Sequence, residues 1–306
     1  MAEKMKILIA YDGIHPFSGL IKDLQRAGLP KAADVIVMTV VDAYVPPSGK
    51  VPKSGRSARI KTGPQGSSAQ VRIQAQLETY AQSAQRAAGQ LKAVFPGWKV
   101  RMETAVDSPA WAVIKKSESW KAKLVVVEAH HRPRLAKIFF GSVAQKIVTE
   151  ARCSVRVVHD EPEEVKTPVR LVIAVDGSED CARAVEAAAA RAWKKGSSVR
   201  LLTVTDVGLA EADIPTGAPR ADGRAEAWIR QMQESFEKKL RAAGLSASSV
   251  VRKGEPSHEI VTEARKWGAD SVFIGARGLQ PVERFLMGSV SASVAAGAPC
   301  SVEVIR

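Results

Sequence analysis

An internal repeat constrains the fold of this chain more than any other feature of its sequence. Residues 6–13 read Lys-Ile-Leu-Ile-Ala-Tyr-Asp-Gly, and residues 170–177 read Arg-Leu-Val-Ile-Ala-Val-Asp-Gly. Each copy is a short aliphatic run, typical of a strand buried on both faces, that ends in an acid and a glycine turn. The 306 residues are enough for about two ordinary domains, so we expect two domains of one fold.

The pattern that follows these two runs is also duplicated, because helix-like periods alternate with apolar segments in both copies. The predicted strands are residues 6–13, 35–42, 99–104, 124–128 and 154–158 in the first copy, and 170–177, 199–206, 249–252, 271–275 and 301–305 in the second. Such alternation predicts a parallel sheet covered on both faces, with right-handed crossovers. The expected fold class is therefore α/β, with two tandem doubly wound sheets of five strands.

A short charged segment, residues 159–168, joins the copies and contains prolines that discourage regular structure. We therefore expect one domain at 1–160 and a second at 168–306. The first copy also carries an insert at residues 44–74, which is rich in Pro, Gly and Ser and has several Lys and Arg but no acid. Two interpretations of this insert stay open, a solvated loop or an anion-binding arm.

Composition limits the classes of partner. The net charge of +13 attracts nucleotides, nucleic acids or anionic lipids without choosing among them. Aromatic residues are 5% of the chain and no stacking or helix-turn-helix motif is present, so specific nucleic-acid readout is not expected. No apolar run is long enough to cross a bilayer and the first residues lack a signal-peptide pattern, which predicts a cytoplasmic protein without a membrane partner.

Candidate metal ligands are weak. Cys153, Cys181 and Cys300 are too few and too scattered for a disulfide framework or a thiolate zinc site, and we expect them to be small core residues. Adjacent residues such as Glu128, His130 and His131 rarely converge on one ion without distant ligands. We therefore predict no metal-binding residues, and no catalytic residues either, since His15 and His258 have no suitably spaced partner.

The strongest candidate for a binding site is a glycine-rich stretch near the C-terminus. The run Ser-Val-Phe-Ile-Gly-Ala-Arg-Gly at 271–278 reads as a buried strand and a sharp turn, and Gly288-Ser-Val-Ser291 then opens a helix. Unpaired N–H groups at a helix start carry partial positive charge, glycine lets an anion approach the backbone, and serine hydroxyls add donors. The stretch therefore predicts a cradle for phosphate groups.

The spacing G-x2-G-x9-G-[ST] of Gly275, Gly278 and Gly288-Ser289 resembles the nucleotide signature of the universal stress protein family, and the resemblance covers nearly the whole chain as two domains. It implies an adenine-nucleotide α-hydrolase-like sheet with strand order 3-2-1-4-5, and ATP, accompanied by Mg²⁺, as the ligand. The positions that it assigns to nucleotide binding are Ala174, Asp176, Val204, Gly275, Arg277, Gly278, Gly288, Ser289, Val290 and Ser291. By this resemblance Asp176 would meet the adenosine, Val204 the adenine edge, and Gly275 and Gly278 the ribose and phosphates. The phosphate chain would be held by Gly288, Ser289 and Ser291, and Arg277 with Arg284, which is outside the set, would screen phosphate charge.

The first copy departs from that pattern. Glu128 stands in the place of Gly275, His131 in the place of Gly278, and Ala144 in the place of Ser291, whereas Asp12 and Gly141-Ser142 persist. Side chains there would occupy the approach to the backbone, and a carboxylate would face phosphate. We therefore expect that only the second domain binds ATP.

Three function classes stay open. The first is an ATP-binding regulatory protein of the stress response, whose two domains form an internal pseudo-dimer through their fifth strands, as the resemblance implies. The second is a slow ATPase or phosphotransferase, although no Walker lysine or kinase catalytic loop is present. The third is a nucleotide-free scaffold for an unidentified protein partner.

Overall fold

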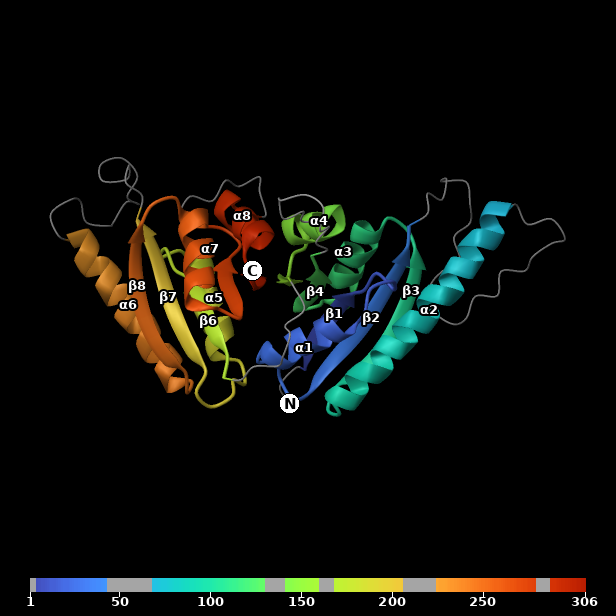
Figure 1. Ribbon diagram of the computed structural model, residues 1–306, viewed down its shortest axis with the longest axis horizontal. Coiled ribbons are helices and arrows are strands. Elements are labelled where there is room, and N and C mark those ends of the chain that lie inside the picture. Colours follow the sequence, from blue (N-terminus) through green and yellow to red (C-terminus); the bar gives the residue numbers. More distant parts are fainter. Residues whose placement is uncertain (1–3, 43–67, 130–140, 160–167, 206–223, 279–286) are drawn as a thin grey trace. The chain divides into compact units, whose positions relative to one another are not determined.

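The computed structural model describes residues 4–42, 68–129, 141–159, 168–205, 224–278 and 287–306 (Figure 1). The predicted domain boundary, most of the basic insert, His130, His131 and Arg284 lie outside these ranges. Among the helices that the structure describes, none is both long enough and apolar enough to cross a bilayer.

The first repeat contains five strands and four helices that alternate along the chain. They are β1 (Met5–Ala10), α1 (Ser18–Arg26), β2 (Ala33–Val41), α2 (Ser68–Val94), β3 (Lys99–Val106), α3 (Pro109–Trp120), β4 (Leu124–Glu128), α4 (Ser142–Glu150) and β5 (Ser154–Val158). Their strand order is β3-β2-β1-β4-β5, and β2 pairs in parallel with both β1 and β3. The predicted order 3-2-1-4-5 is confirmed for this repeat.

The second repeat contains the same succession of elements. They are β6 (Arg170–Ala174), α5 (Glu179–Ala189), β7 (Ser198–Thr205), α6 (Arg224–Ala242), β8 (Ser246–Lys253), α7 (Pro256–Trp267), β9 (Ser271–Gly275), α8 (Ser289–Gly297) and β10 (Ser301–Ile305). All four strand pairs in the order β10-β9-β6-β7-β8 are parallel. Helix α5 starts at Glu179, because Ser178 caps it by accepting a hydrogen bond from the Cys181 N–H.

The two sets of five strands are not separate sheets. Strand β10 pairs with β5 in antiparallel register, with Glu303 opposite Arg156, so the strands form a single sheet. The chain groups into two compact units, Met1–Phe17 with Lys31–Val125, and Ser18–Pro30 with Val126–Arg306. The second unit therefore contains α1, α4 and β5 of the first repeat together with the whole second repeat.

A buried polar network explains why α1 packs with the second repeat. The guanidinium of Arg156 is fully buried and donates to Asp23 of α1 at 2.6 and 2.7 Å, and to the Ser271 hydroxyl at 2.8 Å. Ser301 also donates to Asp23, at 2.6 Å, and Arg191 pairs with Glu303. Burial alone would lower the pKa of Arg156, but the Asp23 and Glu303 carboxylates raise it above its ordinary value.

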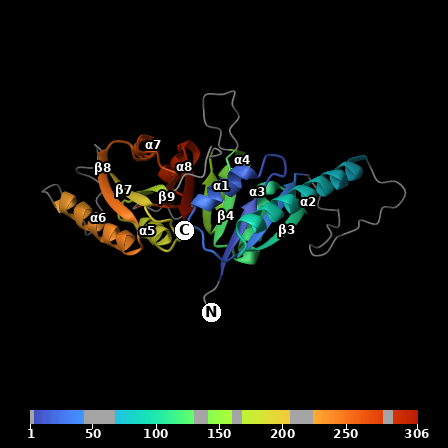
Figure 2. The ribbon, with the colours of Figure 1, turned by 60° about the horizontal axis from the view of Figure 1, so that its bottom comes forward.

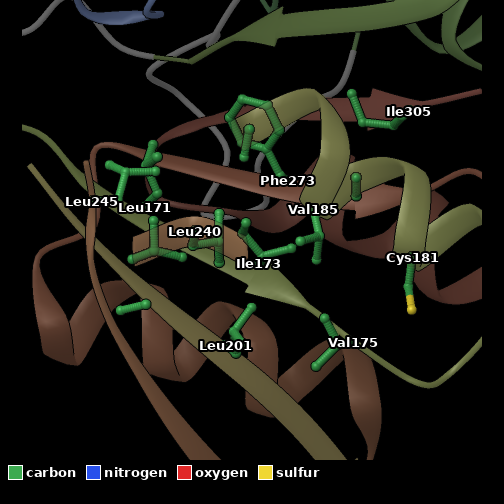
Figure 3. Packing of buried hydrophobic residues seen from close by; sticks show 14 of the residues in the cluster. Leu171, Ile173, Val175, Cys181, Val185, Leu201, Leu240, Leu245, Phe273 and Ile305 are labelled. Atoms are coloured by element: carbon green, nitrogen blue, oxygen red, sulfur yellow. The ribbon is translucent and has the colours of Figure 1, made fainter. Parts of the chain in front are cut away.

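In the second repeat, the sheet separates two helical layers. Helices α5 and α6 contact each other and cover one face, whereas α7 and α8 contact each other and cover the opposite face (Figure 2). Under α5, alternate residues of neighbouring strands such as Leu171, Ile173, Leu201 and Phe273 form a core that is fully buried (Figure 3). Residues of β6 and β9 on the other face are consequently left to line the site described next.

Candidate functional site

A cavity of about 490 Å³ lies at the carboxyl ends of β6, β7 and β9. Strand β6 is the point where the strand order reverses, since β7 lies on one side of it and β9 on the other, and ligands of doubly wound sheets bind at such points. The residues that line the cavity are Ala174, Val175, Asp176, Ser178, Cys181, Leu202, Val204, Pro256, Ile260, Ile274, Gly275, Arg277, Gly278, Met287, Gly288, Ser289, Val290 and Ser291. All ten residues singled out in the sequence are among them.

Asp176 is held by a tight turn that follows β6. Its Oδ1 accepts hydrogen bonds from the Ser178 N–H at 3.0 Å and from the Ser178 hydroxyl at 2.7 Å. The second oxygen, Oδ2, lies beside Gly278, where an added Cβ would come within 2.9 Å of it. One carboxylate oxygen therefore fixes the turn, while the other lies at the cavity next to a residue without a side chain.

Gly275 has a different physical role from the expected one. It shares a strand face with Phe273, the face covered by α5, and an added Cβ would lie 2.7 to 2.9 Å from the backbone of Asp180 and Cys181. Glycine is required here because α5 packs directly on the strand, rather than because a ligand approaches from that side. Glu128 occupies the equivalent strand position in the first repeat.

The N-terminus of α8 forms part of the cavity lining. Gly288 is the N-cap residue, with extended backbone, and the nearest described atom to an added Cβ is 3.6 Å away. The first N–H groups of the helix, those of Ser289, Val290 and Ser291, have no acceptor within the helix and line the cavity. They provide donors and a partial positive charge for an anion.

The expectation that Ser291 offers its hydroxyl to a ligand needs correction. The Ser291 side chain is buried, and its hydroxyl donates to the Gly275 carbonyl at 2.6 Å. That bond ties α8 to the end of β9, and it leaves the backbone N–H as the donor that Ser291 presents. Ala144, its counterpart in the first repeat, lacks this tie.

Arg277 is anchored by Asp180, a residue in the first turn of α5 that the sequence did not single out. Its backbone N–H and its Nε donate to Asp180 Oδ2, at 3.0 and 3.3 Å, and Arg183 pairs with the other oxygen at 2.8 Å. Asp180 is buried under these contacts. An acid in the first turn of a helix is usually assigned to the helix dipole, so the sequence held no signal for this second role.

The corresponding aspartate of the first repeat has a different environment. The Oδ1 of Asp12 accepts from the N–H groups of Ile14 and His15, at 2.9 and 3.0 Å, and Oδ2 contacts the His15 ring nitrogen Nδ1. Both carboxylate oxygens are therefore engaged within the repeat. Burial, and then the nearby Asp12 and Asp42, raise the pKa of Tyr80, which places this phenol close to the same acids.

Cys181 lines the cavity but is not activated. Burial, followed by the charge of Asp176, raises the pKa of its thiol to about 11. The group is therefore protonated at neutral pH, and thiolate chemistry is not favoured at this position. In the part of the chain that the structure describes, no three His, Cys, Asp or Glu residues are grouped so that they could hold a metal ion.

These features define a doubly wound α/β protein with a ligand-sized cavity at the switch point of its sheet. A model of the universal stress protein family matches residues 5–159 and 169–306. The chain therefore belongs to the universal stress protein family and carries its domain twice.

The chain is also similar to curated relatives and, in fold, to solved structures. The universal stress protein YxiE of Bacillus subtilis is 26% identical over 145 residues, which are 45% of this chain and 98% of that protein. The crystal structure of a universal stress protein from Archaeoglobus fulgidus is similar in fold over 98% of both chains, with a TM-score of 0.65 and 17% identity. Another universal stress protein, 20% identical over 45% of this chain and 96% of its own, with a TM-score of 0.33, was solved in complex with cAMP.

Proposed function

We propose that the second repeat binds one adenine nucleotide, ATP with Mg²⁺, and that the protein acts as a nucleotide-dependent regulator of the stress response. The observation that carries the proposal is the mixed chemistry of the cavity lining. It combines apolar side chains such as Leu202, Ile260 and Ile274 with the N-terminus of α8. A nucleotide likewise combines an apolar base with anionic phosphates.

The residues around the cavity suit the parts of this ligand. Ala174 and Val204 would lie against the base, and Asp176 Oδ2 would accept a hydrogen bond from a ribose hydroxyl. The N–H groups of residues 289–291, with the Ser289 hydroxyl, would hold phosphate oxygens, and Gly288 leaves space for them. Mg²⁺ would be bound chiefly by the phosphates, because its usual sites combine substrate phosphates with one or two carboxylates at most.

The first repeat is a poor site for the same ligand. The oxygens of Asp12 are engaged by its own turn, as described above. Ala144 also stands in the place of Ser291, so the first repeat lacks the hydroxyl that ties the helix N-terminus to the strand end in the second repeat. We therefore assign binding to the second repeat alone.

The pairing of β5 with β10 supports the further proposal that the two repeats act as an internal pseudo-dimer. A regulatory role requires that ATP bind two states of the protein with different affinity. A slow ATPase is the second candidate, and the helix N-terminus that would stabilise phosphate charge is the observation in its favour. The third candidate is a nucleotide-free scaffold that binds a protein partner. The cytoplasmic location is a separate prediction.

A matched pair of substitutions tests the binding site. Gly288 and Gly141 are N-cap residues of α8 and α4, and among the described atoms none lies closer than 3.6 Å to a Cβ added at Gly288 or within 4 Å of one added at Gly141. Aspartate is a favourable N-cap, so Gly288→Asp and Gly141→Asp should preserve or raise the thermal stability. In Gly288→Asp, however, the added carboxylate would take the helix donors and repel phosphate.

We expect calorimetric titration with Mg·ATP to show binding by the wild type and by Gly141→Asp, and a loss of at least about 100-fold in affinity for Gly288→Asp, or about 2.7 kcal/mol. Equal affinity of the two variants would contradict the assignment to the second repeat. Absence of binding by the wild-type protein would instead favour the scaffold.

A further inference from the structure

An exposed tryptophan packs against the turn that carries Asp176. Gly177 has a φ of +89°, a conformation that L residues rarely adopt, and an added Cβ would overlap the Cη2 atom of Trp228 in α6. The indole therefore lies directly on the glycine backbone. Trp228 is 36% exposed, so this contact is made at the surface rather than in the core.

The same turn links the indole to the cavity. Gly177 lies between Asp176, whose Oδ2 is at the cavity, and Ser178, which bonds to Asp176 Oδ1 and caps α5. Displacement of Gly177 would change the backbone on both sides of it. Trp228 does not itself line the cavity, so its effect on a ligand would pass through the position of Asp176.

The first repeat contains the same arrangement with a different aromatic residue. Gly13 follows Asp12 with a φ of +77°, and the ring of Tyr80 in α2 lies 3.3 Å from an added Cβ. An aromatic residue of the long helix therefore packs on the glycine after the strand-end aspartate in both repeats. In the first repeat the His15 ring also contacts Asp12. In the second repeat Trp228 of α6 contacts the turn at Gly177.

We propose that Trp228 is a positioning residue that clamps the Gly177 turn from outside and holds Asp176 Oδ2 in place for a ligand hydroxyl. This inference rests on the proposed nucleotide site. It predicts that the clamp acts on ligands with a ribose and has little effect on those with phosphates alone. It also predicts that the ring itself matters, so another aromatic residue should replace it.

The experiment compares wild type with Trp228→Ala, Trp228→Phe and, as the matched control in the first repeat, Tyr80→Ala. Titrations with Mg·ATP should show about tenfold weaker binding for Trp228→Ala, the loss expected when one hydrogen bond to a charged group is misplaced. Trp228→Phe and Tyr80→Ala should bind like wild type. Inorganic triphosphate with Mg²⁺ should bind wild type and Trp228→Ala equally.

A second measurement needs no ligand. The Ser178 N–H donates to Asp176, so its hydrogen exchange in the unliganded protein reports on the turn directly. Faster exchange in Trp228→Ala, restored in Trp228→Phe, is the expected result. Unchanged exchange, or equal ATP affinity of Trp228→Ala and wild type, would overturn the clamp. If the wild-type protein binds no ATP, the proposed function is overturned. The exchange measurement would still test the clamp in that case.

Discussion

Arg156 of β5 and Glu303 of β10 face each other across the antiparallel pair that joins the two repeats, with Nη1 donating to Oε2 at 3.3 Å. Both side chains are buried, and Asp23 of α1 together with Arg191 completes the charge balance. A buried pair of this kind contributes little net stability compared with apolar residues, but removal of one partner leaves an uncompensated charge. The junction between the repeats is therefore sensitive to single substitutions.

Arg156→Ala should lower the free energy of unfolding by about 3–5 kcal/mol, because the Asp23 carboxylate stays buried without a cation and Glu303 keeps only Arg191. Urea denaturation measures this change. Lys146→Ala is the control, since Lys146 and Glu150 form an exposed pair at 3.8 Å, and its cost should stay below about 0.5 kcal/mol. Similar costs for the two variants would show that the buried network does not hold the junction.

Glu263 gives the stability a defined dependence on pH. Burial alone would raise the pKa of Glu263, but Arg200 at 2.6 Å and Arg252 at 2.9 Å lower it below its ordinary value. A carboxyl group with a lowered pKa stabilises the fold above its unfolded pKa of about 4.3, and this contribution is lost as the pH falls through the folded pKa.

Wild type should therefore be more stable than Glu263→Gln at pH 7, and the difference should shrink steadily below about pH 4. Urea unfolding of both proteins over this range measures it. If the difference in unfolding free energy between wild type and Glu263→Gln did not change with pH over this range, protonation of Glu263 would not contribute to the pH dependence of stability.

Gly275→Ala tests the packing role assigned to this glycine. The added methyl group would lie within 3 Å of the α5 backbone, so we expect a loss of about 1–3 kcal/mol in unfolding free energy. Gly288→Ala, at a position with space, should change stability by only a few tenths of a kcal/mol, roughly the difference between these two N-caps. Two equally stable variants would mean that α5 does not press on β9.

Much of the fold was accessible from the sequence, because local patterns determine it. The aliphatic runs around Leu171 and Val272 predict buried strands. Proline favours the first position of a helix, and Pro109 and Pro256 are the first residues of α3 and α7. The glycine spacing also identified a set of residues that do line one cavity. Such signals depend on near neighbours in the chain, which a single sequence displays.

The remaining features depend on contacts between distant residues. Nothing near Arg156 indicates a partner 133 positions away, and nothing near Gly275 shows that α5 lies against it. The hydroxyl of Ser291 was assigned to a ligand because the sequence does not show the Gly275 carbonyl that accepts its hydrogen. Each of these features depends on which residues of distant elements come into contact when the protein folds.

The most direct test of nucleotide binding by one repeat is a count of ATP molecules bound to each chain. Native mass spectrometry of the intact protein with Mg·ATP at saturating concentration provides that count. We predict one nucleotide per chain in the wild type and in Gly141→Asp, and none in Gly288→Asp. Two nucleotides per chain, or one that persists in Gly288→Asp, would contradict the account.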